Sequence, residues 1–207
     1  MNINILMTPF VVLSTGGVQL SAKLWTPNTT NTNPAYPVVL FVHQYTKMGG
    51  SGQLMEGMAR KAARSGYSAV TFDLRGAGRS AGSCSFTNFA ELDDVKAVID
   101  HIATEMQRDV FIVGSSGGAA LAGSALDYSE RVKGGMLIGY TWGWWASFLF
   151  GWAFTAIESS SKPKIFVVGD RDQFTGMDLY EDKISKFIQH LARERACTII
   201  LENFPEN

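Results

Sequence analysis

Short apolar runs alternate along this chain with segments of helical periodicity, and this alternation restricts the fold more than any other feature. The run Val38–His43 is apolar almost throughout, as expected of a strand buried on both faces of a parallel sheet. Apolar residues recur at three- and four-residue steps over Thr87–Met106, which predicts an amphipathic helix. The alternation predicts an α/β fold with a mostly parallel sheet and helices on both faces. The same patterns predict further strands at Ala69–Phe72, Val110–Val113, Gly135–Ile138, Ile165–Val168 and Thr198–Leu201, and further helices at Leu54–Arg64, Gly117–Leu126 and Met177–Leu191.

One strand is of a different kind. Val18–Trp25 alternates apolar and polar residues, which is typical of a half-buried antiparallel strand at the edge of such a sheet. The polar stretch Asn28–Asn33 that follows predicts a loop within one domain and not a linker between two. The length of 207 residues suits a single domain, so we expect one domain over residues 1–207.

The composition excludes several classes of protein. Eighteen Lys and Arg balance 19 Asp and Glu, so the chain lacks the basic excess of a general nucleic-acid binder. Two cysteines, Cys84 and Cys197, cannot form a disulfide-rich scaffold, and we expect packed thiols. The N-terminus lacks the basic start of a secretory signal, which favours a cytoplasmic protein. No cluster of potential ligands has metal-binding spacing, and no cofactor is expected.

The uncharged stretch Gly134–Ile157 is long enough to span a membrane as a helix. Glycines at 134, 135 and 139 interrupt its first half, so the pattern favours a buried strand followed by an aromatic-rich loop and a helix. The aromatic residues of this stretch either line an apolar pocket or form an exposed apolar patch. They are Trp142, Trp144, Trp145, Phe148, Phe150, Trp152 and Phe154.

The segment Gly114-Ser115-Ser116-Gly117-Gly118 carries the sharpest chemical signal. It follows a predicted strand and opens a helix rich in small residues, as a G-x-S-x-G nucleophile elbow does. The nucleophile of such an elbow occupies a strained turn, so the residues two positions to either side must be small. Gly114 and Gly118 meet this requirement and leave Ser116 as the nucleophile. A phosphate-binding loop is excluded because no Gly-Lys-Ser/Thr follows, and a dinucleotide-binding loop fits poorly.

With these motifs in order, the chain resembles the α/β-hydrolase superfamily from about Gly17 onward. Val38–His43 ends in His-Gln-Tyr, where the family has His-Gly and an oxyanion-hole residue. Asp73–Ser80 is similar to the D-x-R-G-x-G-x-S loop, in which Asp73 and Arg75 would brace the loop. Gly169–Asp172 is similar to the family's acid turn. The run HQYTKMGG is typical of a group of plant hydrolases in this superfamily.

The resemblance implies a role for each matching residue. Ser116 would attack an acyl carbonyl. The backbone N–H groups of Gly117 and Tyr45 would form the oxyanion hole. Asp172 would orient a general-base histidine, with Asp170 as the reserve.

The histidine of this implied triad is missing from its expected place. In the family's order it follows the last strand, but after Thr198–Leu201 the chain ends at Asn207 without a histidine. The family's closing helix would be missing as well. His101 and His190 lie on predicted helices. His43 is the remaining candidate for the base, although the resemblance assigns it a loop-shaping role.

Two explanations remain open, and they lead to different functions. The chain is either a C-terminally shortened form of a serine hydrolase of ester, thioester or acyl-peptide bonds, or a non-catalytic protein of the same fold that binds a small apolar ligand or a partner. The intact Ser116 and Asp172 favour the first. Membrane association through the aromatic segment is a third and weaker alternative.

Overall fold

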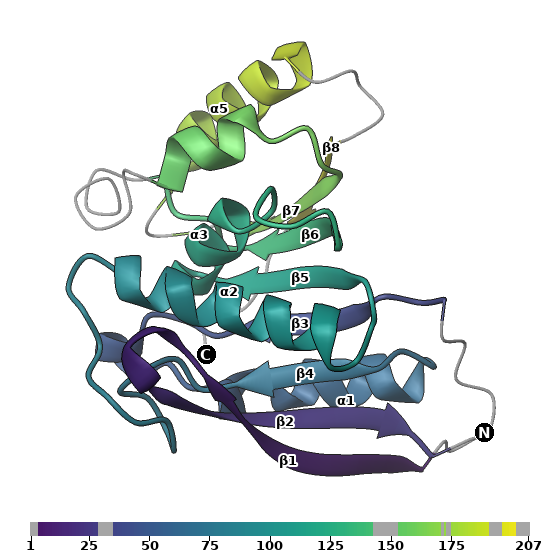
Figure 1. Cartoon of the computed structure of the whole chain (residues 1–207). Coiled ribbons are helices and arrows are strands. Elements are labelled where there is room, and N and C mark those ends of the chain that lie inside the picture. The colour runs from purple at the N-terminus through teal and green to yellow at the C-terminus, as the bar shows by residue number, and fades with distance from the viewer. Residues whose placement is uncertain are drawn as a thin grey trace.

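The computed structural model describes residues 4–28, 35–142, 153–170, 172, 175–190 and 196–201, with the backbone alone for 186–190 and 196–201. The described strands form one eight-stranded sheet in the order β1-β2-β4-β3-β5-β6-β7-β8 (Figure 1). The strands are β1 (Ile5–Leu13), β2 (Gln19–Pro27), β3 (Val38–Val42), β4 (Ala69–Phe72), β5 (Val110–Ser115), β6 (Val132–Ile138), β7 (Lys164–Gly169) and β8 (Ala196–Leu201). The helices are α1 (Glu56–Arg64), α2 (Phe89–Thr104), α3 (Gly117–Ser124) and α5 (Met177–His190), together with residues 153–159.

Neighbouring strands from β4 through β8 are parallel, whereas β2 is antiparallel to both β1 and β4. In Figure 1, α1 lies behind the sheet, and α2 and α3 lie in front of it. This arrangement confirms the predicted α/β class, the mostly parallel sheet and the helices on both faces. The carboxyl ends of parallel strands meet at one edge of a sheet, so the segments that follow β3, β4, β5, β6 and β7 are brought together there.

The helix over Thr87–Met106 and the strand Ala69–Phe72 form as predicted, with differences of at most two residues at the helix ends. The helix expected from Leu54 begins instead with a 3₁₀ turn, Gly52–Met55, and becomes α-helical at Glu56. Such tight turns are frequent at helix N-termini. Gly134–Ile157 begins with the predicted strand, now the last part of β6, and residues 153–159 are helical. The aromatic residues at 144, 145, 148, 150 and 152 lie outside the described residues.

The sequence pattern does not predict β1, because most of its side chains are exposed and show no burial alternation. The strand forms through nine residue pairs with β2. The Asn28 N–H donates to the Asn4 carbonyl, and the Ser14 N–H donates to the Val18 carbonyl. In β1, the backbone N–H and C=O groups of even-numbered residues therefore point toward β2. Pro9 has an odd number, so its backbone groups point away from β2. A proline at that point removes an N–H group with which another strand could pair.

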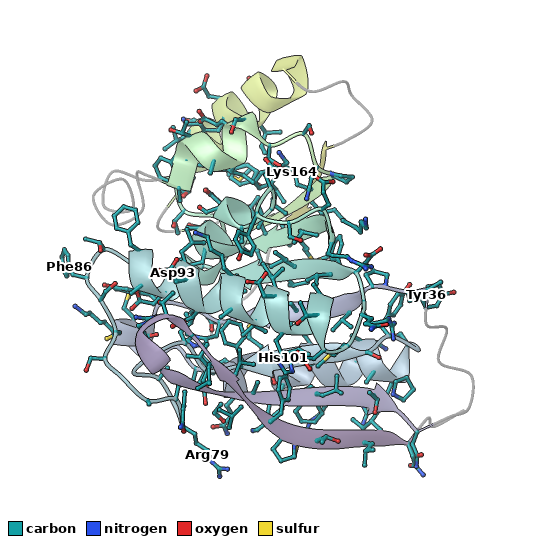
Figure 2. The ribbon with its side chains drawn as sticks, in the orientation of Figure 1. Tyr36, Arg79, Phe86, Asp93, His101 and Lys164 are labelled. Atoms are coloured by element: carbon teal, nitrogen blue, oxygen red, sulfur yellow. The ribbon has the colours of Figure 1, made fainter. Side chains whose placement is uncertain are left out.

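Two apolar clusters fill the space between the sheet and its helices. On the α1 face, Ala59 and Ala63 pack with Phe41, Val113 and their neighbours. On the other face, Val95, Val98, Ile99 and Ile102 of α2 are fully buried against the sheet. The tight packing of both clusters fixes the strand ends that carry the candidate site. Figure 2 shows how the side chains fill both layers.

Candidate active site

The turn between β5 and α3 has the strained backbone of a nucleophile elbow. Ser116 has φ 53° and ψ −123°, a region that residues with a side chain rarely occupy. The sequence predicts this strain from the glycines on either side. A Cβ atom at Gly114 would lie 2.3 Å from the Gly118 carbonyl oxygen, and one at Gly118 would lie 2.2 Å from the His43 carbonyl oxygen. Both neighbours are backbone atoms, so neither position has room for a side chain.

The elbow is also tied to the next strand. The Ser116 N–H donates to the Ile138 carbonyl at 2.8 Å, at the end of β6. Ser116 is half-buried, and Gly117 is the buried first residue of α3. The first N–H groups of a helix have no carbonyl partner within the helix, so they are suited to stabilise a negative charge.

The loop after β3 lies directly against the elbow. Gly118 packs on the carbonyl groups of Val42 and His43, which places the start of α3 beside this loop. The Tyr45 carbonyl accepts hydrogen bonds from the N–H groups of Met48 and Gly50, at 3.0 and 3.1 Å. The resulting tight turn holds the Tyr45 backbone at the carboxyl end of β3, next to the strand that carries Ser116. The predicted oxyanion-hole residues Tyr45 and Gly117 therefore come from two adjacent strand ends.

His43 is fully buried, and both of its ring nitrogens have hydrogen bonds. The Leu74 N–H donates to Nε2 at 3.0 Å, so the proton is on Nδ1, which donates to the Gln44 carbonyl at 2.6 Å. Burial lowers the pKa of His43 and keeps the ring neutral. The ring thus joins the end of β3 to the loop after β4. These contacts favour the loop-shaping role over that of a base for Ser116.

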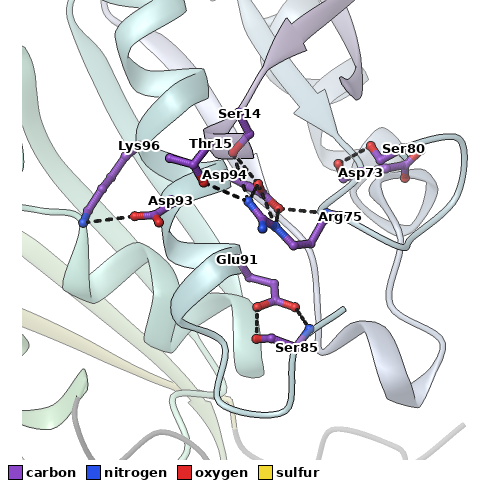
Figure 3. Close-up of polar contacts among 10 residues, drawn as sticks. All are labelled: Ser14, Thr15, Asp73, Arg75, Ser80, Ser85, Glu91, Asp93, Asp94 and Lys96. Atoms are coloured by element: carbon purple, nitrogen blue, oxygen red, sulfur yellow. Dashed lines mark hydrogen bonds and ion pairs between the residues drawn. The ribbon is translucent and has the colours of Figure 1, made fainter. Parts of the chain in front are cut away.

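The loop after β4 is braced as the sequence suggests. Backbone N–H groups of Gly52 and Arg79 donate to the two carboxylate oxygens of Asp73, at 2.8 and 3.0 Å. The Arg75 guanidinium binds the fully buried Asp94 carboxylate, and this hydrogen bonding raises the pKa of Arg75 (Figure 3). The Arg75–Asp94 pair connects this loop to α2, and the bond between Asp73 and Gly52 connects it to the 3₁₀ turn Gly52–Met55. The side chains of Asp73 and Arg75 thus hold the loop in place.

Asp172 follows β7 and lies at the same edge of the sheet as the elbow. Its N–H donates to the Gly169 carbonyl at 3.2 Å, and its Oδ1 accepts from the Thr175 N–H at 2.8 Å. Its Oδ2 faces Gly139, where a Cβ atom would be 3.8 Å away. Gly139 directly follows Ile138, whose carbonyl binds the Ser116 N–H. The structure therefore brings Ser116 and Asp172 to the ends of β5 and β7, on either side of β6, and Asp172, rather than Asp170, is the carboxylate beside Gly139.

A cluster of aromatic side chains lies close to the acid turn that follows β7. Trp142 is buried, with ring centroids 4.6, 5.3 and 5.2 Å from those of Tyr140, Phe166 and Tyr180. Burial raises the pKa of Tyr180, and the negative charge of Asp172 adds to the shift. Phe154 also packs on this cluster. Of the predicted aromatic set, the described members Trp142 and Phe154 thus contribute to the core.

The remaining sequence-based candidates lie elsewhere or outside the description. His101 stacks on Phe10 of β1 with a centroid distance of 5.0 Å, away from the elbow (Figure 2). His190 ends α5, and only its backbone is described. Cys84 is a half-buried free thiol, and the side chain of Cys197 is not described. Within the described ranges there is no group of three or more potential metal ligands and no helix long and apolar enough to cross a bilayer.

The model of the X-Pro dipeptidyl-peptidase (S15) family matches residues 16–136, more than half of the chain. The chain belongs to this family. The span that matches the S15 model contains the loop after β3, the Asp73–Ser80 loop and the elbow. The acid turn lies beyond it. Membership in a hydrolase family gives the chain a hydrolase-like character.

Solved structures confirm the α/β-hydrolase fold of this S15-family chain. It is similar to XC6422 from Xanthomonas campestris, an α/β serine hydrolase without a lid, at TM-score 0.73 and 17% identity, over 95% of this chain and 84% of that one. The Pyrococcus furiosus esterase Pf2001 matches at TM-score 0.76 and 17% identity, over 96% and 82%. A serine hydrolase homologue from Coxiella burnetii matches at 0.75 and 19%, over 95% and 87%. No curated protein sequence matches the chain significantly.

Two residues of the candidate site are not predicted from the sequence. Gly139 has φ 58° and lies beside the Asp172 carboxylate. Thr175 donates its N–H to that carboxylate. The bond of Thr175 could have been predicted from the sequence, because aspartate in a turn commonly accepts a hydrogen bond from an N–H two or three residues further on. No local pattern identifies Gly139, whose role depends on a contact between β6 and the turn after β7.

Proposed function

We propose that this chain is a serine hydrolase of carboxylic acyl bonds with Ser116 as its nucleophile. The observation that carries the proposal is the strained backbone of Ser116 between two glycines without room for a side chain. Strain of this kind persists only where the surrounding structure imposes it, and it is concentrated at functional sites. Asp172 at a nearby strand end supports the same interpretation, because a nucleophile and an acid are then present at one edge of the sheet.

The proposed reaction begins with attack of the Ser116 Oγ on the carbonyl carbon of the substrate. The hydroxyl proton passes to a general base beside Asp172, a position that neither His43 nor His101 occupies among the described residues. Backbone N–H groups of Gly117 and Tyr45 stabilise the negative oxygen, which is worth about 3 kcal/mol per donor. The carbon–heteroatom bond then breaks, and the leaving group takes the proton from the base. Water hydrolyses the acyl-Ser116 ester in the second half and restores the hydroxyl.

The proposed substrates are esters, thioesters and acyl-peptide bonds. All three present a carbonyl carbon to the nucleophile and place negative charge on one oxygen. The name of the S15 family adds peptides with proline in the second position to this set. Rates measured on a panel of p-nitrophenyl esters, an acyl thioester and an X-Pro p-nitroanilide would show which of the three classes is hydrolysed fastest.

A second candidate function is ligand binding without catalysis. The specific observation in its favour is that His43, the described histidine next to the elbow, uses both ring nitrogens in hydrogen bonds to Leu74 and Gln44. A serine hydroxyl without a base is a weak nucleophile at neutral pH. In this alternative, a small apolar ligand binds at the same edge of the sheet, and its affinity survives Ser116→Ala.

Reaction with a fluorophosphonate, followed by intact-mass spectrometry, tests the nucleophile. We expect one adduct on the wild-type chain, none on Ser116→Ala, and an unchanged adduct on the matched neighbour variant Ser115→Ala. Asp172→Asn should slow the reaction. A parallel series with added imidazole supplies a base from solution. If the folded chain forms no Ser116 adduct with or without imidazole, the proposed nucleophile is wrong and the binding function gains support.

A further inference from the structure

Thr175 is buried, with 1% of its surface exposed, and it makes three hydrogen bonds at the carboxyl edge of the sheet. Its N–H donates to Asp172 Oδ1 at 2.8 Å. Its hydroxyl oxygen accepts from the backbone N–H of Trp142 at 2.9 Å and lies 3.5 Å from the Tyr140 carbonyl, toward which it donates. One side chain thus connects the turn after β7 with the segment after β6.

From this geometry we infer that Thr175 is the positioning residue of the acid: its hydroxyl fixes the turn after β7 against β6 so that the Asp172 carboxylate stays beside Gly139. The inference rests on the proposed function for its catalytic meaning. It goes further, because it identifies a residue that touches no substrate and still controls where the acid lies.

The contacts explain why the hydroxyl is needed. The N–H of Thr175 holds one oxygen of the carboxylate and leaves Oδ2 toward Gly139. That N–H can hold the carboxylate in place only if residue 175 is itself fixed. The hydroxyl provides this by accepting a hydrogen bond from the backbone N–H of Trp142, a residue whose indole is packed among Phe166 and Tyr180. A rigid aromatic cluster therefore anchors the acid through one hydroxyl group.

Valine is the informative substitution at this position, because it has nearly the shape of threonine but no hydroxyl. Thr175→Val keeps the N–H that binds Asp172 and removes the two bonds of the hydroxyl, from the Trp142 backbone N–H and to the Tyr140 carbonyl. Thr175→Ser retains the hydroxyl and should therefore behave like the wild type. Thr71→Val is the matched control: Thr71 is also buried, and its hydroxyl accepts a hydrogen bond from the Trp25 indole at 3.0 Å, but it lies on β4.

Amide hydrogen exchange followed by NMR tests the inference without requiring activity. An amide proton bound to a carboxylate is protected from exchange with solvent, so the residue 175 amide of the wild type should exchange slowly. Asp172→Ala removes the acceptor and should abolish this protection, and Thr175→Val should remove most of it. Thr175→Ser and Thr71→Val should retain it. Undiminished protection in Thr175→Val would overturn the inference.

The fluorophosphonate rate gives the second readout. If Ser116 reacts, Thr175→Val should slow labelling roughly 10- to 100-fold, since a small misplacement of a catalytic group has a cost of this size. Thr175→Ser and Thr71→Val should react close to the wild-type rate. A Thr175→Val rate equal to that of Thr71→Val would contradict the inference. If the wild type fails to react, the proposed function fails, and amide exchange alone decides on the position of the acid.

Discussion

The elbow at the end of β5 and the acid turn at the end of β7 lie at the same edge of the sheet, but the structure holds them by different means. The elbow is fixed by backbone contacts that are too close for any side chain, at Gly114 and Gly118. The acid turn is held by hydrogen bonds, among them those of Thr175. A Cβ atom at Gly139, beside the acid, would meet nothing closer than 3.8 Å.

This difference follows from what each region would do in the proposed reaction. The elbow would have to keep Ser116 at a positive φ, and only close packing on both sides makes such a conformation persist. The acid turn would have to keep a carboxylate in one orientation, and directional hydrogen bonds achieve that. We therefore expect steric changes to damage the elbow and polar changes to damage the acid turn.

The largest effect is expected from Gly118→Ala. Its methyl group would lie 2.2 Å from the His43 carbonyl oxygen and 2.5 Å from that of Val42, and backbone atoms cannot move aside. We expect the free energy of unfolding to fall by about 3 kcal/mol or more, measured by urea denaturation.

Gly57→Ala in α1 is the matched control, because a Cβ atom there meets nothing within 4 Å. It should stabilise the chain by about 0.5–1 kcal/mol through helix propensity. Similar losses in the two variants would show that the elbow is no tighter than an exposed helix position.

A second prediction concerns the pH dependence of stability on the elbow side. Burial lowers the folded-state pKa of His43 below 6.5. The unfolded chain therefore binds the proton first as the pH falls, and the stability present above pH 6.5 is lost progressively below it. The contribution is at most about 1.4 kcal/mol per pH unit. Urea denaturation at a series of pH values measures the slope.

His43→Gln should remove this part of the slope, whereas His101→Gln keeps His43 and should retain it. The comparison matters because His43 connects the oxyanion loop to the loop after β4 through Leu74. An equal slope in the wild type and in His43→Gln would mean that the ring is not held neutral by its surroundings.

The same contrast explains what the sequence could predict. The elbow is encoded by residues within five positions of each other, so its glycines indicate the turn and Ser116 directly. The parallel strands are equally local, because each is a continuous apolar run. The acid turn depends on contacts between Thr175 and a segment more than thirty residues earlier, for example with Trp142. No local pattern records such a contact.

The strand β1 illustrates the other reason for a missed element. Its side chains are mostly exposed, so it lacks the alternation by which half-buried strands are recognised. It forms because its backbone pairs with β2 along its whole length. Pairing of this kind depends on the partner strand and on the turn at Thr15–Gly17. The sequence alone does not show that this turn, and not another, joins two paired strands.

The smallest effect is expected from Gly139→Ala, the counterpart of the elbow variant on the acid side. Its methyl group would make an ordinary contact with Asp172 Oδ2, so the cost comes from the backbone at φ 58° and not from a clash. We expect the free energy of unfolding to fall by about 1 kcal/mol in the same urea assay. Since the carboxylate keeps its bond to the Thr175 N–H, the residue 175 amide should remain protected from exchange. A loss as large as that of Gly118→Ala would show that the acid turn is also held by close packing, and the distinction between the two regions would then disappear.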